Sequence, residues 1–139
     1  MKSDKKTFPY TSKIILKPIG YLTTNETNIP RHWSVSESVG VIVVEERYVA
    51  GLRDIKTGDK ILVVFHFHKS PEFSSEYLFQ HPPHKEREFG IFSTCSPIRP
   101  NPIGISIVEV LEVKDNHISV KGIDMIDGTP VLDIKPWHV

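Results

Sequence analysis

The chain has 139 residues, with 17 basic side chains, 17 acidic side chains and one cysteine. This length fits one domain with a single core, and the neutral charge excludes the strongly basic class of nucleic-acid binders, although it is compatible with a local basic face. One cysteine excludes an internal disulfide, the start lacks a signal-peptide core, and no apolar run approaches the roughly 18 residues of a membrane span, so we expect a cytoplasmic protein.

The beginning of the chain predicts a polar segment followed by a strand. Residues 1–12 are polar, and we expect them to be flexible, ahead of a single domain over 13–139. An apolar and β-branched run over 13–22 predicts the first strand, which Pro18 and Gly20 disturb or end. A polar connection follows this strand.

The middle of the chain predicts two strands and a long loop. Residues 38–52 begin as a strand, and their second half fits either a strand or a helical turn. Gly58-Asp59 then marks a turn. The run 60–70 is dense in isoleucine, valine and phenylalanine and predicts a central strand. Residues 71–89 predict a polar loop, and loops of this length inside a compact domain are often functional.

The last third of the chain predicts four more strands. They cover 90–95, 103–116, 117–126 and 131–137, with a hairpin turn at Asp115-Asn116. No stretch of ten or more residues has a helical period. Many short strands joined by turns therefore predict an all-β fold, either a small barrel or a sandwich.

Two histidines end the central strand. His66 and His68 are two residues apart, which places both on one face. They could be metal ligands, with His81 or His84 completing a zinc or iron site. The alternative is a strand end that enters solvent. No nearby glutamate or cysteine completes a recognisable spacing, so we expect no metal.

The segment SPIRPNPIG, residues 96–104, places three prolines within six residues between two predicted strands. Proline fixes φ and restricts the preceding residue, so this loop should keep one shape at little entropic cost on binding. Arg99 offers a planar fork to a carboxylate or phosphate, and the Asn101 amide can donate and accept. The alternative is a stiff connection in which both side chains satisfy local backbone groups.

The segment GIDMIDGTPVLDIKPW, residues 122–137, contains three carboxylates within ten residues, Asp124, Asp127 and Asp133, with Lys135 close by. Carboxylates at this place could bind ribose hydroxyls, an ammonium group or a metal. The alternative is a capped turn with a surface ion pair, because Asp-Gly alone is an ordinary turn signal.

Five segments together resemble the TsaA-like family, also called TrmO-type, of S-adenosylmethionine-dependent tRNA methyltransferases. They occur in the family's order and span 17–137: KPIGYL, IPRHW, VVFHFHKS, GIFSTCSPIRPNPIGIS and VKGIDMIDGTPVLDIKPW. The proline-rich segment and the last segment are highly specific to this family.

The resemblance implies a fold, a cofactor and a reaction. The fold is a small single β-barrel-like domain, unlike the Rossmann type, and it works as a homodimer with the cofactor near the subunit interface. The cofactor is S-adenosyl-L-methionine. The reaction is methylation of N6 of threonylcarbamoyladenosine at tRNA position 37, which makes tRNA the expected partner. Bacterial members often carry an additional C-terminal segment after the last motif, whereas this sequence ends at Val139. The resemblance therefore implies that the tRNA contacts of such a segment come from elsewhere.

The resemblance also implies site residues. The family's cofactor contacts fall on Pro30, Arg31, His32, His68, Lys69, Cys95, Ile105, Gly122, Ile123, Asp124, Met125, Ile126 and Asp127. Contacts to substrate and tRNA are expected at Arg87, Arg99, Asn101 and Lys135. Asp124, Asp127 and His68 are the candidates for a catalytic base.

The sequence departs from the family pattern at Cys95, where the family has arginine. A thiol cannot replace a charged fork, so Arg87 or Arg99 would have to compensate. This departure could mark a non-catalytic barrel that binds S-adenosylmethionine or RNA. A methyltransferase of the same family that acts on another substrate is a further alternative, because one sequence does not identify the substrate-facing residues.

Overall fold

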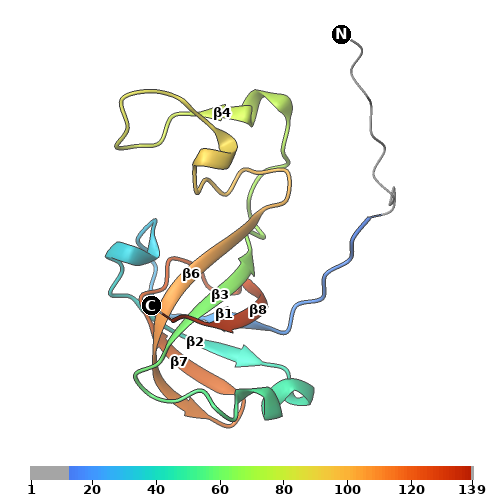
Figure 1. The fold of residues 1–139 in the computed structure, drawn as a ribbon, viewed down its shortest axis with the longest axis vertical. Coiled ribbons are helices and arrows are strands. Elements are labelled where there is room, and N and C mark those ends of the chain that lie inside the picture. Colours follow the sequence, from blue (N-terminus) through green and yellow to red (C-terminus); the bar gives the residue numbers. More distant parts are fainter. Residues whose placement is uncertain (1–12, 139) are drawn as a thin grey trace.

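The centre of the molecule is a closed antiparallel barrel of six strands (Figure 1). The structure is a computed structural model that describes residues 13–138, so the flexibility expected for 1–12 lies outside the described residues. The strand order around the barrel is β1-β2-β7-β6-β3-β8. The barrel strands are β1 (Gly20–Thr23), β2 (Val39–Val44), β3 (Lys60–His66), β6 (Ile103–Lys114), β7 (His117–Lys121) and β8 (Pro130–Pro136). The predicted all-β barrel is confirmed.

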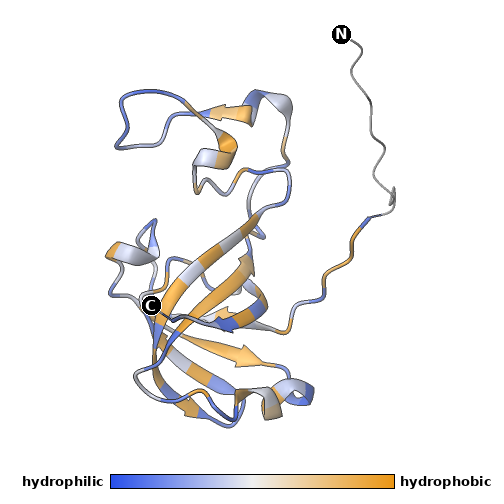
Figure 2. Ribbon diagram, viewed as in Figure 1, coloured by the Kyte–Doolittle hydropathy of each residue, from blue (hydrophilic) through white to orange (hydrophobic). Residues whose placement is uncertain are grey.

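Alternation along the strands builds one hydrophobic core. On β3, Ile61, Val63 and Phe65 are buried, and on β6 the buried positions include Val108 and Val110. Fully burying one such side chain stabilises the fold by about 1.5–3 kcal/mol. Figure 2 shows this pattern as hydrophobic colour along the strands and hydrophilic colour along most loops.

The chain between β3 and β6 leaves the barrel as an excursion, residues 67–102, which Figure 1 shows beyond one end of the barrel. Its base is closed where the Phe67 amide donates to the Pro102 carbonyl (2.8 Å). The Ser70 hydroxyl donates to the Pro97 carbonyl (2.9 Å) and ties the two arms together. The excursion contains η3 (Ser75–Leu78), β4 (Phe79–Gln80), β5 (Phe89–Gly90) and η4 (Ile91–Ser93). The long loop predicted over 71–89 therefore has short ordered elements of its own.

Some local predictions differ from the structure, and one open choice is resolved. The strand predicted over 117–126 ends at Lys121. The first strand begins only at Gly20, because Pro18 has no amide to donate to a ladder. The open choice at the end of 38–52 resolves as a 3₁₀ helix, η2 (Glu46–Leu52). The strand predicted over 90–95 is wrong beyond Gly90, because the Thr94 amide and hydroxyl both bond to the Ile91 carbonyl and close a turn.

The remaining helical segment, η1 (Trp33–Val35), follows the IPRHW motif. His32 is its N-cap, and the His32 ring nitrogen Nδ1 accepts from the Ser34 amide (3.2 Å). An N-cap side chain satisfies an amide that the first helical turn leaves without a partner. The cap therefore fixes the orientation of the imidazole relative to the loop.

Gly104 is expected to be sensitive to substitution. A Cβ there would lie 2.6 Å from ring atoms of both Phe65 and Phe67, which pack edge to face with centroids 5.0 Å apart. Gly104→Ala should therefore lower the free energy of unfolding by about 1–3 kcal/mol, measured by urea denaturation. Gly51→Ala, which meets nothing within 4 Å, is the matched control and should change little. Equal stability of the two variants would contradict the packing described.

Candidate functional site

The motif segments meet around one end of the barrel. The carboxylate of Asp124 accepts hydrogen bonds from the Trp33 amide (3.0 Å) and from the Ser106 hydroxyl. Asp127 accepts from the amide of Thr24, at the end of β1 (2.9 Å). These bonds bring the IPRHW loop, the GIDMIDGTP segment and strand β6 together.

The Asp124 carboxylate is mostly withdrawn from solvent. Burial raises its pKa, while the hydrogen bonds from Ser106 and from the Trp33 amide, and the charge of His32, lower it. Desolvation disfavours the charged form of a carboxyl, and donors to that form favour it. Both oxygens of this carboxylate accept hydrogen bonds from the protein.

Buried serines hold the segment that carries Asp124. The Ser36 hydroxyl donates to the Ile123 carbonyl, and the Ser38 carbonyl accepts from the Gly122 amide (2.8 Å). Gly122 has φ of +102°, which lets the chain turn out of β7 at this point. Sequence reasoning missed Ser36, Ser38 and Ser106. Only Ser106 offered a signal in the sequence, because its hydroxyl alternates in phase with the buried valines of the same strand and therefore predicts a buried polar group that needs a partner.

A cleft of about 550 Å³ lies between the IPRHW loop and the excursion. We call it the loop cleft; its lining is Arg31, His32, Gln80, His81, Pro82, Pro83, His84, Lys85, Ser93, Thr94, Cys95, Ser96 and Pro97. The structure thus brings three of the predicted cofactor contacts, Arg31, His32 and Cys95, to one cavity. The basic and imidazole side chains in this lining suit an anionic or nucleotide ligand.

The proline-rich loop uses its arginine locally. Nη1 of Arg99 donates to the carbonyls of Thr94 (2.8 Å) and Ser96 (3.3 Å), the two neighbours of Cys95. This matches the alternative in which the arginine satisfies backbone groups. Its positive charge nevertheless lies in the same turn as Cys95.

Other predicted contacts lie apart from the loop cleft. Arg87 stacks on the Phe89 ring with its guanidinium carbon 3.9 Å from the centroid. Lys135 pairs with Asp133 on β8 (3.0 Å). Asn101 and Ile105 are exposed at and just beyond the base of the excursion.

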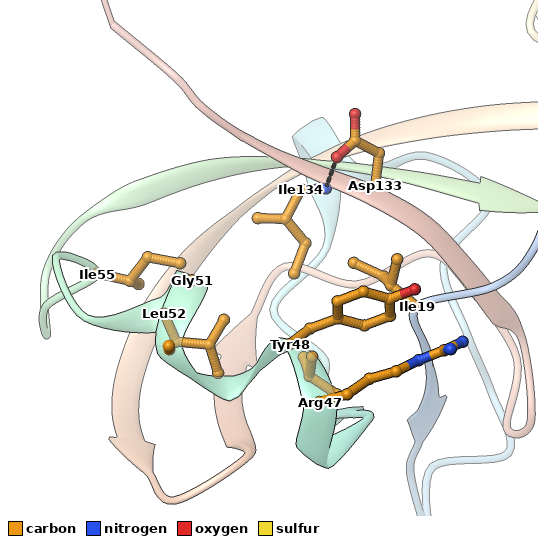
Figure 3. Close-up of a pocket in the computed structure, with 10 residues that line it drawn as sticks. Ile19, Arg47, Tyr48, Gly51, Leu52, Ile55, Asp133 and Ile134 are labelled. Atoms are coloured by element: carbon orange, nitrogen blue, oxygen red, sulfur yellow. Dashed lines mark hydrogen bonds between the residues drawn. The ribbon is translucent and has the colours of Figure 1, made fainter.

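A second cavity, of about 390 Å³, lies beside η2 (Figure 3). Its lining includes Ile19, Tyr48, Leu52 and Ile134, together with Asp133. None of the predicted cofactor, substrate or catalytic residues lines it. Asp133 therefore does not join the other two aspartates of its segment, which bond to Trp33, Ser106 and Thr24 instead.

Comparison with known proteins identifies the family of the chain. A family model described as the tRNA-methyltransferase O N-terminal domain matches residues 21–139. The chain belongs to this family.

Relatives of known description cover most of the chain. An S-adenosyl-L-methionine-binding protein of Archaeoglobus fulgidus is 39% identical over 127 residues, which span 89% of each chain. The human tRNA (adenine(37)-N6)-methyltransferase is 34% identical, with 91% of this chain matched to 31% of the human protein. A crystal structure of TrmO from Pseudomonas aeruginosa superposes with a TM-score of 0.73 at 27% identity, matching 93% of this chain to 58% of that one.

Two further observations concern metal ligands and membrane spans. Within residues 13–138, no three His, Cys, Asp or Glu side chains lie close enough together to hold a metal ion. The metal-site alternative at His66 and His68 therefore has no ligand set there. None of the helical segments in this part of the chain has the length and apolar character needed to span a bilayer.

His68 is placed to remain neutral near physiological pH. Burial lowers its pKa from the ordinary 6.5, and the charges of Lys69 and His66 lower it further. Its Nε2 atom lies 3.9 Å from the position of a Cβ on Gly128, so it sits beside the DGTP turn.

The titration of His68 can be measured directly. In a proton NMR titration, we expect its midpoint to lie below 6.5, and Lys69→Met should raise that midpoint because it removes a nearby positive charge. Lys56→Met, in the turn before β3, is the control and should leave the midpoint unchanged. A midpoint above 6.5 in the unmodified protein would contradict the placement of His68.

Proposed function

We propose that this chain is an S-adenosyl-L-methionine-dependent methyltransferase that acts on N6 of threonylcarbamoyladenosine at position 37 of tRNA. The observation that carries the proposal is the loop cleft. One wall is the IPRHW loop, which Asp124 anchors to the barrel, and the other is the excursion, which contributes residues 80–85 and 93–97. The IPRHW loop and residues 93–97 belong to two of the segments that resemble the family to which the chain belongs.

S-adenosyl-L-methionine is the proposed cofactor, and its sulfonium supplies a methyl group that is already activated for transfer. The protein then has to hold the ligand, align it and exclude water. Arg31 and His32 line the loop cleft and suit the carboxylate and hydroxyl groups of such a ligand. The backbone of Gly122–Asp127, fixed by buried hydroxyls, supplies a rigid second set of contacts.

Among the three candidate bases, the structure favours His68. Both oxygens of Asp124 already accept hydrogen bonds, and Oδ1 of Asp127 accepts from Thr24. His68, in contrast, is partly exposed and has a lowered pKa, so its neutral form is available at pH 7. The N6 proton of the modified adenosine lies next to a carbonyl and is more acidic than that of adenine. A modest base is therefore sufficient to take it.

A basic surface for tRNA is proposed around the loop cleft. Arg31 and Lys85 line it, and Arg87 lies on the same excursion. Lys121, by contrast, pairs with Glu37 on the barrel (2.8 Å). The homodimer remains part of this proposal, because exposed aliphatic and aromatic side chains such as Ile15 and Phe92 suit a subunit contact. Sedimentation equilibrium tests that part.

A second candidate is a barrel that binds the cofactor without transferring its methyl group. It is favoured by the archaeal relative, which matches the chain over nearly its full length and is named as a binding protein. Cys95 at the arginine position points the same way. Cofactor binding without methylation of any tRNA preparation would select this candidate.

Cofactor binding should depend on the cleft wall. In calorimetric titration with S-adenosyl-L-methionine, Arg31→Ala should weaken affinity at least about tenfold, because a charge-assisted contact is lost. Arg53→Ala, at an exposed arginine paired with Asp54, is the matched control. Unchanged affinity in Arg31→Ala would remove this wall from the binding site, and no binding by the unmodified protein would reject the proposed function.

Turnover should depend on His68. With tRNA that carries unmethylated threonylcarbamoyladenosine, His68→Gln should lower kcat by about 10²–10⁴-fold, as expected when a general base is lost. Mass spectrometry of the digested tRNA measures the product. Cofactor affinity should be retained within a fewfold. Loss of cofactor binding would instead assign His68 to ligand contact, and unchanged turnover would exclude it as the base.

Binding to tRNA should weaken steeply as salt rises, because each phosphate contact releases counterions. Filter binding over a salt series measures the slope of log K against log salt. Replacing both Lys85 and Arg87 by glutamine should make this slope shallower by about 1–2. Replacing Arg53 and Lys56, near η2, should leave it unchanged. A salt-independent affinity would contradict the basic surface.

A further inference from the structure

Ser106 is an unusual residue for its place in the barrel. It lies on β6 opposite Val63, in phase with Val108, and its side chain has no solvent exposure. An apolar side chain would fill such a position without any requirement for a partner. A buried hydroxyl costs stability unless it is hydrogen-bonded, so its partner is informative. That partner is the Asp124 carboxylate.

The same Asp124 carboxylate also bonds to the IPRHW loop. Its second oxygen, Oδ2, accepts the amide of Trp33, the first residue of η1 (3.0 Å). A hydrogen bond to an ionised acceptor is about twice as strong as one between neutral groups. The residues immediately before this amide are Arg31 and His32, which line the loop cleft.

The far side of the loop is fixed independently. The His32 imidazole accepts the Ser34 amide through Nδ1 and contacts the Ser34 hydroxyl (2.7 Å). With Nδ1 accepting, a neutral imidazole carries its proton on Nε2. One turn of backbone is thus held by Asp124 at Trp33 and by His32 at Ser34, and only the first of these contacts connects it to the barrel wall.

We propose that Ser106 is a positioning residue, which through the Asp124 carboxylate holds the Trp33 backbone and thereby the Arg31–His32 wall of the loop cleft. The proposal rests on the proposed function only in taking S-adenosyl-L-methionine as the ligand of that wall. It assigns Asp124 a structural link in place of the catalytic role considered for it.

The backbone amide signals of the two tryptophans allow this link to be measured by NMR. Selective ¹⁵N-tryptophan labelling gives two backbone amide signals, Trp33 and Trp137. The Trp33 amide should shift with pH as Asp124 titrates, whereas the Trp137 amide, which donates to the Lys60 carbonyl (3.1 Å), should serve as the reference. His32 is the neighbouring titratable group whose charge acts on Asp124, so its own titration is followed in parallel.

Removal of the serine hydroxyl should move this titration. The Ser106 hydrogen bond lowers the pKa of Asp124, so Ser106→Ala should raise that pKa further and shift the Trp33 midpoint to higher pH. Affinity for S-adenosyl-L-methionine should fall about tenfold, and the pH below which binding weakens should rise with the same midpoint. Ser106→Thr keeps the hydroxyl and should restore both. Ser119→Ala, at a strand serine on β7, is the matched control.

Asp124→Asn tests the link if Ser106→Ala does not fold. Asparagine has the same shape and can still accept the Trp33 amide, but it does not titrate, so the pH-dependent shift of Trp33 should disappear. A Trp33 titration that persists in this variant overturns the proposal. So does a Ser106→Ala variant that matches Ser119→Ala in both the Trp33 signal and cofactor affinity. If the Trp33 results hold but the unmodified protein binds no cofactor, the proposed function fails and the link stands.

Discussion

Closure of the barrel by β8 is the constraint on which the site depends. β8 pairs with β1 at Pro130 and Val131 and with β3 along most of its length, so it closes the ring between these two strands. In the ring order, however, β7 and β8 are not neighbours. The connection between them, 122–129, has to pass across the end of the barrel. Segments that cross a barrel end either plug the core or stay in solvent.

This connection plugs the core. Ile123 and Met125 are buried and face inward, which places the intervening Asp124 on the other side of the segment, toward the IPRHW loop. The alternation that drives the two apolar side chains into the barrel is thus the cause of the position of the carboxylate. Because the plug is fixed by core burial, a loop that hydrogen-bonds to Asp124 acquires the rigidity of the barrel.

Much of the fold, but less of the site, could be predicted from the sequence. The pattern of β6 and β7 and the hairpin at Asp115-Asn116 are local signals, and the structure has both strands and the turn, with β7 ending at Lys121. The family motifs identified Arg31, His32 and Cys95, which line one cleft. Asp124 bonds to Ser106, which is 18 positions away in the sequence, and to Trp33, which is 91 positions away. Pairing over such distances leaves no local signal in the sequence. The role of Arg99 was open for a different reason, because its fork could reach either a ligand or the backbone of its own loop.

Arg99 bears on the expected departure from the family pattern at Cys95. Nη1 of Arg99 bonds to the carbonyls on either side of Cys95, so a guanidinium already stabilises this turn from within. The proline-rich loop therefore does not need a second arginine to keep its shape. What an arginine at position 95 would add is a charged fork reaching into the loop cleft, where Cys95 is exposed. A thiol in its place leaves Arg31 and Lys85 as the fixed charges of that lining. The cleft retains its shape but presents a weaker field to an anionic ligand, so the effect of Cys95 should fall on affinity rather than on the fold.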